Sequence, residues 1–163
     1  MSVSIGIVFS STSAGAYRDA GLKDVDVLND LSVFEFDTDA EASAFCHGVD
    51  DACGYSECVV KNVRDGARIA KVSFGKEDSR AGKFNDVVFH SAAERKAYEK
   101  GVMEAEGWGD YAQVEDYELA DYRNAVALTL ERGLPVMPDK VVQHLKSRDE
   151  LEGLLEDLPE DKE

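Results

Sequence analysis

The fold of this chain is decided by two similar stretches, FDTDAEASAFCHGVDDACGY at residues 36–55 and FHSAAERKAYEKGVMEAEGW at residues 89–108. They align without gaps at a constant offset. Their identical positions are Phe36/Phe89, Ala40/Ala93, Glu41/Glu94, Ala44/Ala97, Gly48/Gly101, Val49/Val102, Ala52/Ala105 and Gly54/Gly107. Because helix caps, apolar positions and glycines all agree in one register, the alignment predicts a duplicated structural unit.

Each stretch has the pattern of a helix start followed by one apolar helical face. Thr38 and Ser91 are suited to accept a backbone N–H bond as N-caps, and Glu41 and Glu94 complete a capping box three residues later. Apolar residues then recur at the spacing of one helical face in both copies. The pattern therefore predicts matching helices.

The paired glycines predict where these helices pack and end. Gly48 and Gly101 fall in mid-helix, where glycine costs about 1 kcal/mol relative to alanine, so we expect close packing of each helix on a sheet. Gly54 and Gly107 follow the last apolar residue, where a left-handed C-cap favours glycine. An aromatic residue then begins a new strand, so each unit is predicted to be strand, helix, strand.

The segments before and between the two units are less regular. Residues 3–9 are predicted to form a buried strand, whereas residues 10–32 have a mixed pattern. Residues 58–62 and 67–74 are predicted strands joined at Asp65-Gly66, a pair typical of hairpin turns. Residues 75–83 are predicted to form a polar loop.

The C-terminal part is predicted to be helical. A helix is expected from Asp116 to Gly133, with an apolar stripe on one side. Pro135 and Pro138 interrupt the chain, and a last helix is expected over residues 140–158. The final DLPEDKE sequence is expected to fray.

These elements predict an α+β fold. The two strand–helix–strand repeats are expected to form one ferredoxin-like sheet with both helices on one face, followed by C-terminal helices. The expected parts are an N-terminal segment at 1–32, a duplicated core at 33–115 (repeat one 33–62, hairpin 63–83, repeat two 84–115) and an extension at 116–163.

Composition narrows the possible partners. There are 34 Asp and Glu residues against 18 Lys and Arg, giving a net charge of −16. Such a charge repels nucleic acid and anionic membranes and attracts basic proteins. No apolar run approaches the ~20 residues of a membrane span. Three cysteines with no signal-peptide pattern favour reduced thiols and a cytoplasmic location.

The charges are segregated along the chain, with acidic repeats on either side of a basic hairpin at residues 61–83. The second repeat continues into a dense run of carboxylates and aromatic rings. We expect this run to form an acidic binding face, which comprises Glu104, Glu106, Trp108, Asp110, Tyr111, Glu115 and Asp116. Carboxylates interleaved with aromatic rings would imitate phosphates and bases on a basic nucleic-acid-binding protein.

A second hypothesis concerns the Ser/Thr-rich segment after the first strand. The sequence IGIVFSSTSAG at residues 5–15 resembles the phosphate loop of flavodoxins, which implies flavin-phosphate binding. The matching positions are Ser10, Ser11, Thr12, Ser13 and Gly15. However, a flavodoxin needs four more alternating βα units, which the duplicated unit and its hairpin do not supply.

No pattern in the chain indicates a catalytic or metal centre. Cys46, Cys53 and Cys58 lack the short pair spacing of structural zinc sites, and the second repeat replaces them with other residues. His47, His90 and His144 are far apart and have no sequence-local nucleophile. We therefore expect no catalytic residues, no metal and no cofactor.

The repeat pattern F-x-[TS]-x-A-E-x-x-A-[FY]-x-x-G-V-x-x-A-x-G-[YW] resembles a short unit in small uncharacterised bacterial and phage proteins. It covers about 20 residues of each copy and carries no activity with it. By analogy it suggests a phage or mobile-element inhibitor that occupies the basic nucleic-acid-binding surface of a host protein. The remaining alternative is a purely structural homo-oligomer, since pseudo-symmetric units can pair edge to edge.

Overall fold

The computed structural model describes residues 2–134 and 136–146, and it is an α+β structure with two separate three-stranded antiparallel sheets. Sheet A has the order β2-β1-β6 and sheet B has the order β3-β4-β5. The strands are β1 (Val3–Phe9), β2 (Leu31–Phe36), β3 (Cys58–Val60), β4 (Ile69–Phe74), β5 (Asn85–Val88) and β6 (Tyr111–Gln113).

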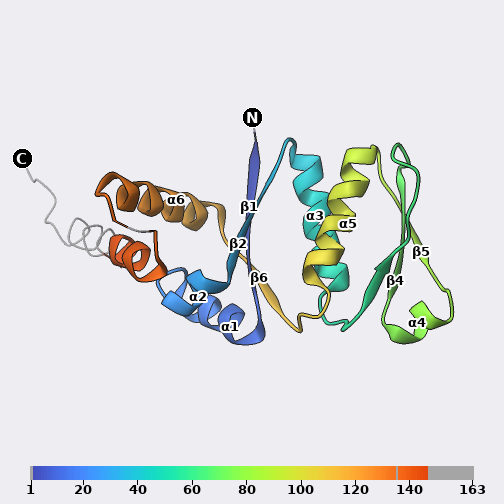
Figure 1. Cartoon of the computed structure of the whole chain (residues 1–163), viewed down its shortest axis with the longest axis horizontal. Coiled ribbons are helices and arrows are strands. Elements are labelled where there is room, and N and C mark those ends of the chain that lie inside the picture. The colour runs from blue at the N-terminus through green and yellow to red at the C-terminus, as the bar shows by residue number, and fades with distance from the viewer. Residues whose placement is uncertain (1, 135, 147–163) are drawn as a thin grey trace, which may run out of the picture.

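Two long helices, α3 (Asp39–Ala52) and α5 (Ala92–Ala105), lie between the two sheets (Figure 1). Helix α3 leaves sheet A and leads to sheet B, whereas α5 leaves sheet B and leads to sheet A. Each sheet thus combines two antiparallel strands that are consecutive in the chain, β1 with β2 or β4 with β5, with a single strand from the other repeat, β6 or β3. The predicted α+β class and the two strand–helix–strand units are present.

The single ferredoxin-like sheet with both helices on one face is a wrong prediction. The strands divide into two sheets because the helices are apolar enough to be covered on both sides. Phe45 of α3 packs on Phe34 and Phe36 of sheet A, at ring-centroid distances of 4.6 and 4.9 Å. Its counterpart Tyr98 of α5 packs on Phe89, which follows β5, at 5.0 Å. Each sheet therefore has its own helix on its inner face.

The paired glycines bring the two helices into backbone contact. A Cβ atom added to Gly48 would overlap the carbonyl oxygen of Tyr98, and one added to Gly101 would overlap the carbonyl oxygen of Phe45. The close packing predicted for these glycines is therefore real, but it joins helix to helix and not helix to sheet. Only glycine allows two helix backbones to approach this closely.

The predicted N-caps and the glycines predicted after the last turn are confirmed at both helices. The backbone N–H of Glu41 donates to Thr38 Oγ1, and that of Glu94 donates to Ser91 Oγ, each at 3.1 Å. Gly54 and Gly107, one residue beyond the two C-caps, have φ values of 99° and 86°. These are left-handed conformations that favour glycine.

The correspondence extends to the strands that precede the aligned stretches. Both β1 and β4 end in phenylalanine, and the next residues, Ser10 and Gly75, have φ values of 93° and 87°. After these positions the two halves differ. Helices α1 (Ser11–Ala20) and α2 (Val25–Asp30) follow β1, whereas the short helix α4 (Lys76–Arg80) follows β4. The 75–83 segment predicted as a loop therefore contains a helix, because a left-handed glycine is followed by residues that tolerate a helical turn.

Among the described residues, helices cover only one of the two outer sheet faces, where "outer" means facing away from α3 and α5. The outer face of sheet A is covered by α1, α2, α6 (Asp116–Glu131) and the helical residues 138–146 (Figure 1). These helices build a second apolar core on Val8, Ala112 and Val114. Among the described residues, only α4 lies against sheet B beyond the central helices, at one end.

The 3–9 strand, the hairpin at Asp65-Gly66 and the helix from Asp116 are confirmed, with β3 and β4 shorter than predicted. Residues 140–146 of the predicted last helix are helical, while its remainder and the DLPEDKE sequence lie outside the described residues. No helix in the described ranges is both long and apolar enough to cross a bilayer.

Candidate binding surface

The two loops that follow α3 and α5 lie against each other and form a shared surface. The backbone N–H of Gly54 donates to the carbonyl of Trp108 at 2.8 Å, and the N–H of Gly107 donates to the carbonyl of Tyr55 at 2.9 Å. These reciprocal bonds join equivalent positions of the two repeats. We call residues 53–57 and 106–110 the twin-loop surface.

Each loop presents one half-exposed aromatic ring. Tyr55 is 45% exposed and Trp108 is 42% exposed. Tyr55 rests on Phe74 at the end of β4, with centroids 5.5 Å apart. Trp108 stacks on Phe9 at the end of β1, at 6.0 Å and an interplanar angle of 19°. Half-exposed Tyr and Trp rings held by packing are the side chains most enriched at binding hot spots.

The predicted acidic face is partly engaged in structural contacts. Glu106 accepts the backbone N–H of Cys58 at 2.9 Å and so anchors the start of β3. The carboxylate of Asp110 accepts hydrogen bonds from both terminal nitrogens of Arg18, at 2.8 and 2.9 Å. The hydrogen bond from Arg18 lowers the pKa of Asp110, so the carboxylate stays ionised and its charge is compensated.

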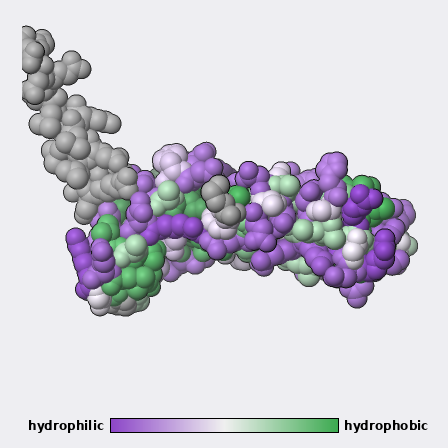
Figure 2. Space-filling view, turned by 90° about the horizontal axis from the view of Figure 1, so that it is seen from above, coloured by the Kyte–Doolittle hydropathy of each residue, from purple (hydrophilic) through white to green (hydrophobic). Residues whose placement is uncertain are grey.

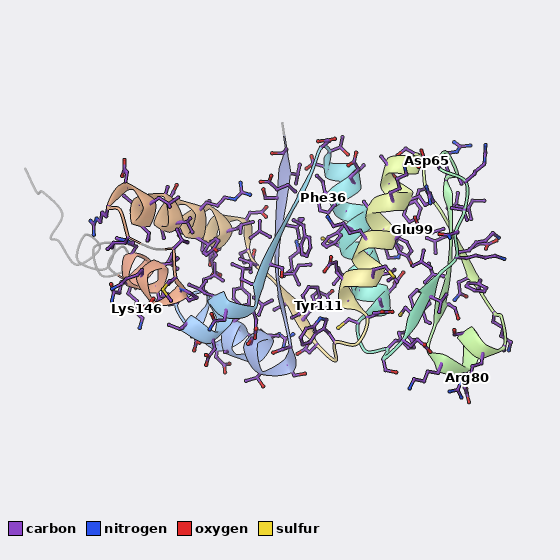
Figure 3. All side chains as sticks on the ribbon, in the orientation of Figure 1. Phe36, Asp65, Arg80, Glu99, Tyr111 and Lys146 are labelled. Carbon is purple, nitrogen blue, oxygen red and sulfur yellow. The ribbon has the colours of Figure 1, made fainter. Side chains whose placement is uncertain are left out.

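Tyr111 connects the twin-loop surface to α3. Its hydroxyl donates to Asp50 Oδ1 at 2.9 Å, and the residue lies at the foot of the central helices (Figure 3). Burial and the neighbouring Asp50 raise the pKa of Tyr111 to about 12. Tyr111 is therefore a neutral hydrogen-bond donor that fixes β6 against α3, and its contribution to a partner surface is small.

The other predicted acids divide between two places. Glu104 is exposed on the last turn of α5 and adjoins the twin-loop surface. Glu115 and Asp116 are exposed at the far end of β6, where α6 begins. The structure therefore brings together Glu104, Glu106, Trp108 and Asp110, and it places Glu115 and Asp116 elsewhere.

Sequence reasoning missed two members of this surface. Tyr55 is the counterpart of Trp108 at the repeat offset, and Glu57 is the counterpart of Asp110. The alignment contained the signal, because a surface residue of one repeat predicts its partner in the other.

The segment predicted to bind a flavin phosphate forms the first turn of α1. Ser10 is its N-cap and accepts the N–H of Ser13 at 3.2 Å. The buried hydroxyl of Ser13 donates to a carboxylate oxygen of Asp30. Since this carboxylate lies beside the helix start, it would repel a phosphate there. Ser11 and Thr12 are exposed, and no atom lies within 4 Å of a Cβ built on Gly15.

A cleft of about 410 Å³ lies at the other end of α1, between α1, α6 and Leu145. Its polar groups bond to one another. Tyr17 accepts the backbone N–H of Glu115 and donates to Glu118, which also accepts the N–H of Leu22. Burial raises the pKa of Tyr17 to about 12. These bonds stabilise the junction of α1 and α6. Because Tyr17 and Glu118 are already engaged in them, these two side chains do not indicate a ligand for the cleft.

The three cysteines are free thiols whose pKa is raised by burial. The pKa of Cys58 reaches about 11 through burial and the nearby carboxylates Glu106 and Glu57. At neutral pH these groups are therefore protonated and weak nucleophiles. Within the described ranges, no group of three or more His, Cys, Asp and Glu side chains is arranged to hold a metal ion.

In comparisons with known proteins, no family model, no curated protein and no solved structure matches this chain.

Proposed function

We propose that this protein is a non-enzymatic binding protein that holds a basic protein partner on its twin-loop surface. The observation that carries the proposal is the pair of half-exposed rings, Tyr55 and Trp108, on loops that are fixed to each other. Rigid aromatic rings contribute contact area at low conformational cost. The surrounding carboxylates and the net charge of −16 favour a partner of opposite charge.

The partner we infer is a protein that binds nucleic acid through Lys and Arg. Carboxylates at Glu57, Glu104 and Glu106 would occupy positions of phosphates, and the aromatic rings would occupy positions of bases. A protein acting in this way would inhibit its partner by competition with nucleic acid. This role fits the phage or mobile-element hypothesis and a cytoplasmic location with reduced thiols.

The proposal is tested by affinity capture from a bacterial lysate at low and high salt, followed by mass spectrometry. We expect the wild-type chain to retain a basic nucleic-acid-binding protein that DNA or RNA displaces and that high salt weakens. The double variant Tyr55→Ala/Trp108→Ala should lose this partner, and Glu104→Lys should weaken its retention.

Two matched controls separate the twin-loop surface from general charge and aromatic effects. Tyr117 is 67% exposed and Glu131 is exposed, and both lie on α6, which begins at the end of β6 that is opposite to the twin loops. Tyr117→Ala and Glu131→Lys should leave capture unchanged. Equal capture by the wild type and by the folded Tyr55→Ala/Trp108→Ala variant would contradict the proposal.

A further inference from the structure

The outer face of sheet B exposes apolar side chains where sheet A is covered. Val88 is 71% exposed and Ile69 is 39% exposed, and the two residues are direct neighbours across β4 and β5. Ala70 and Val72 point inward and are fully buried, so Ile69 and Lys71 lie on the outer face. Figure 2 shows hydrophobic residues among hydrophilic ones at this end of the molecule.

These side chains line a groove of about 510 Å³. Its apolar members include Val63, Ile69 and Val88, and its potentially cationic members are Arg64, Arg68, Lys71 and His90. No acidic residue of the described chain lines the groove, although the protein carries 34 acidic residues. Lys71 is paired with Asp86 at 3.0 Å outside the lining set. The groove is thus apolar with a basic rim on a strongly acidic protein.

The chain contains a segment with the complementary pattern. Residues 147–163, SRDELEGLLEDLPEDKE, carry eight acidic residues and two basic ones. Leucines at positions 151, 154, 155 and 158 follow the i, i+3, i+4, i+7 spacing of one helical face. An apolar stripe bordered by carboxylates matches an apolar groove bordered by Arg and Lys.

Sheet A shows how an apolar outer face is covered in this fold. On sheet A, the helical residues 138–146 place Val141, Val142 and Leu145 in the core that covers the outer face. The complementary segment follows directly in the sequence. In this fold, a helix with a small apolar stripe, residues 138–146, therefore already covers the outer face of sheet A.

The complete leucine stripe, which begins at Leu151, cannot enter the groove of its own molecule. Lys146 and Asp65, which lies in the turn beside the groove, are at opposite ends of the protein (Figure 3). Layers of helices and sheets pack about 10 Å apart, so at least roughly 30 Å separate the outermost helix from the groove. Leu151 is five residues beyond Lys146, which allows about 18 Å of extended chain.

We propose that the groove on the outer face of sheet B binds the leucine-bearing acidic segment 147–163 of a second copy of this chain. The contact joins two different surfaces, so a dimer still has one free groove and one free segment. The protein therefore associates head to tail, and its mass increases with concentration. Because Arg and Lys on the rim contribute to the contact, high salt weakens the association.

The test is sedimentation velocity of the full chain over a wide range of concentration. The wild type should shift from monomer toward dimer and larger species. Val88→Asp places a charge in the groove, and Leu154→Asp/Leu155→Asp interrupts the stripe, so each variant should raise the dissociation constant by about tenfold or more. Leu130, which is 62% exposed on α6, supplies the matched control. Leu130→Asp should associate like the wild type.

Mixing the two variants gives the sharper result. The Val88→Asp chain keeps its acidic segment, and the Leu154→Asp/Leu155→Asp chain keeps its groove, so an equimolar mixture should form a dimer and nothing larger. A wild type that stays monomeric throughout overturns the proposal, as does a mixture without dimer. Binding of a labelled oligonucleotide or an unrelated acidic protein to the groove of a monomeric wild type would also overturn it, in favour of that occupant.

This proposal is independent of the twin-loop function. Tyr55→Ala/Trp108→Ala should associate as the wild type does while losing its captured partner. Val88→Asp should lose self-association while keeping that partner.

Discussion

The two halves of this molecule share one plan and differ in how their outer faces are completed. Each half has two antiparallel strands joined through a helical connection, a central helix on its inner face and a third strand supplied by the other half. In the described part of the chain, sheet A is covered outside by four helical segments, whereas sheet B leaves Ile69 and Val88 exposed. The comparison shows that the central helix pair and its hydrogen-bonded loops form the shared core. The outer layers are where the halves became different.

The largest expected effect comes from breaking the contact that joins the halves. Gly48→Val or Gly101→Val would force a side chain into the backbone of the opposite helix, where even a Cβ overlaps a carbonyl oxygen. We expect a loss of about 4 kcal/mol or more in unfolding free energy, measured by urea denaturation, or failure to fold.

Gly66 is the matched control for these substitutions. It lies in the turn between β3 and β4, and no atom lies within 4 Å of a Cβ built on it. Gly66→Ala should therefore change stability by less than about 0.5 kcal/mol. If Gly48→Ala proved as harmless as Gly66→Ala, the two helices would not be in backbone contact.

The second prediction uses a polar pair that only one half contains. Arg95 and Glu99 of α5 stand where α3 has Ala42 and Cys46. Arg95 is 4% exposed, bonds to Glu99 at 2.8 Å and donates to the carbonyl of Asp65 at 2.9 Å. Glu99→Leu would leave the guanidinium buried without its carboxylate and should cost about 3 kcal/mol of unfolding free energy.

A double variant distinguishes a lost ion pair from lost packing. Arg95→Met/Glu99→Leu replaces both partners by apolar side chains, as in the first half, and should recover most of the stability lost by Glu99→Leu. Equal losses for the single and the double variant would show that the cost lies in packing and not in the isolated charge.

The third prediction compares matched apolar positions. Val49 and Val102 are both 0% exposed and occupy the same place on α3 and α5. Removal of two buried methyl groups should cost about 2 kcal/mol at either position, measured by urea denaturation. We expect the losses for Val49→Ala and Val102→Ala to agree within about 0.5 kcal/mol. A larger difference would mean that the covering helices of sheet A stabilise the core beneath them.

The sequence alone was sufficient for features that depend on local patterns. Thr38, Ser91, Gly54 and Gly107 all have the structural roles predicted from the repeat. The role of Gly48 was only half predictable, because close approach to a sheet and close approach to a helix require the same glycine. The division of strands between two sheets depends on non-local pairings such as β1 with β6, which no local pattern encodes.

The aromatic residues of the twin-loop surface could be predicted from the sequence, but the pairing of its charges could not. Trp108 was expected to contribute, and the repeat offset could also have identified Tyr55. The pairing of Arg18 with Asp110 could not be predicted, because it joins residues 92 positions apart through the placement of α1. This pairing shows why a run of acids in the sequence overstates the charge available to a partner.

The smallest expected effect concerns the ion pair between Arg18 of α1 and Asp110. In the described part of sheet B, no arginine forms the equivalent pair with Glu57, the counterpart of Asp110. The hydrogen bond from Arg18 lowers the pKa of Asp110 below its ordinary value in the folded protein. A carboxyl group with a lowered folded-state pKa stabilises the fold above its unfolded pKa and loses this contribution as the pH falls through the folded value. Asp110→Asn should therefore destabilise the protein at neutral pH and flatten the acid side of its stability profile, measured by urea denaturation across pH.

Glu57, the counterpart of Asp110 in the first repeat, makes the comparison decisive. Among the described residues, the Glu57 side chain makes no ion pair or hydrogen bond like that between Arg18 and Asp110, so Glu57→Gln should leave the unfolding free energy close to that of the wild type. Identical profiles for Asp110→Asn and the wild type would mean that Arg18 does not hold the carboxylate in solution. The twin-loop surface would then be more acidic than the structure indicates, and a basic partner would meet one additional uncompensated charge.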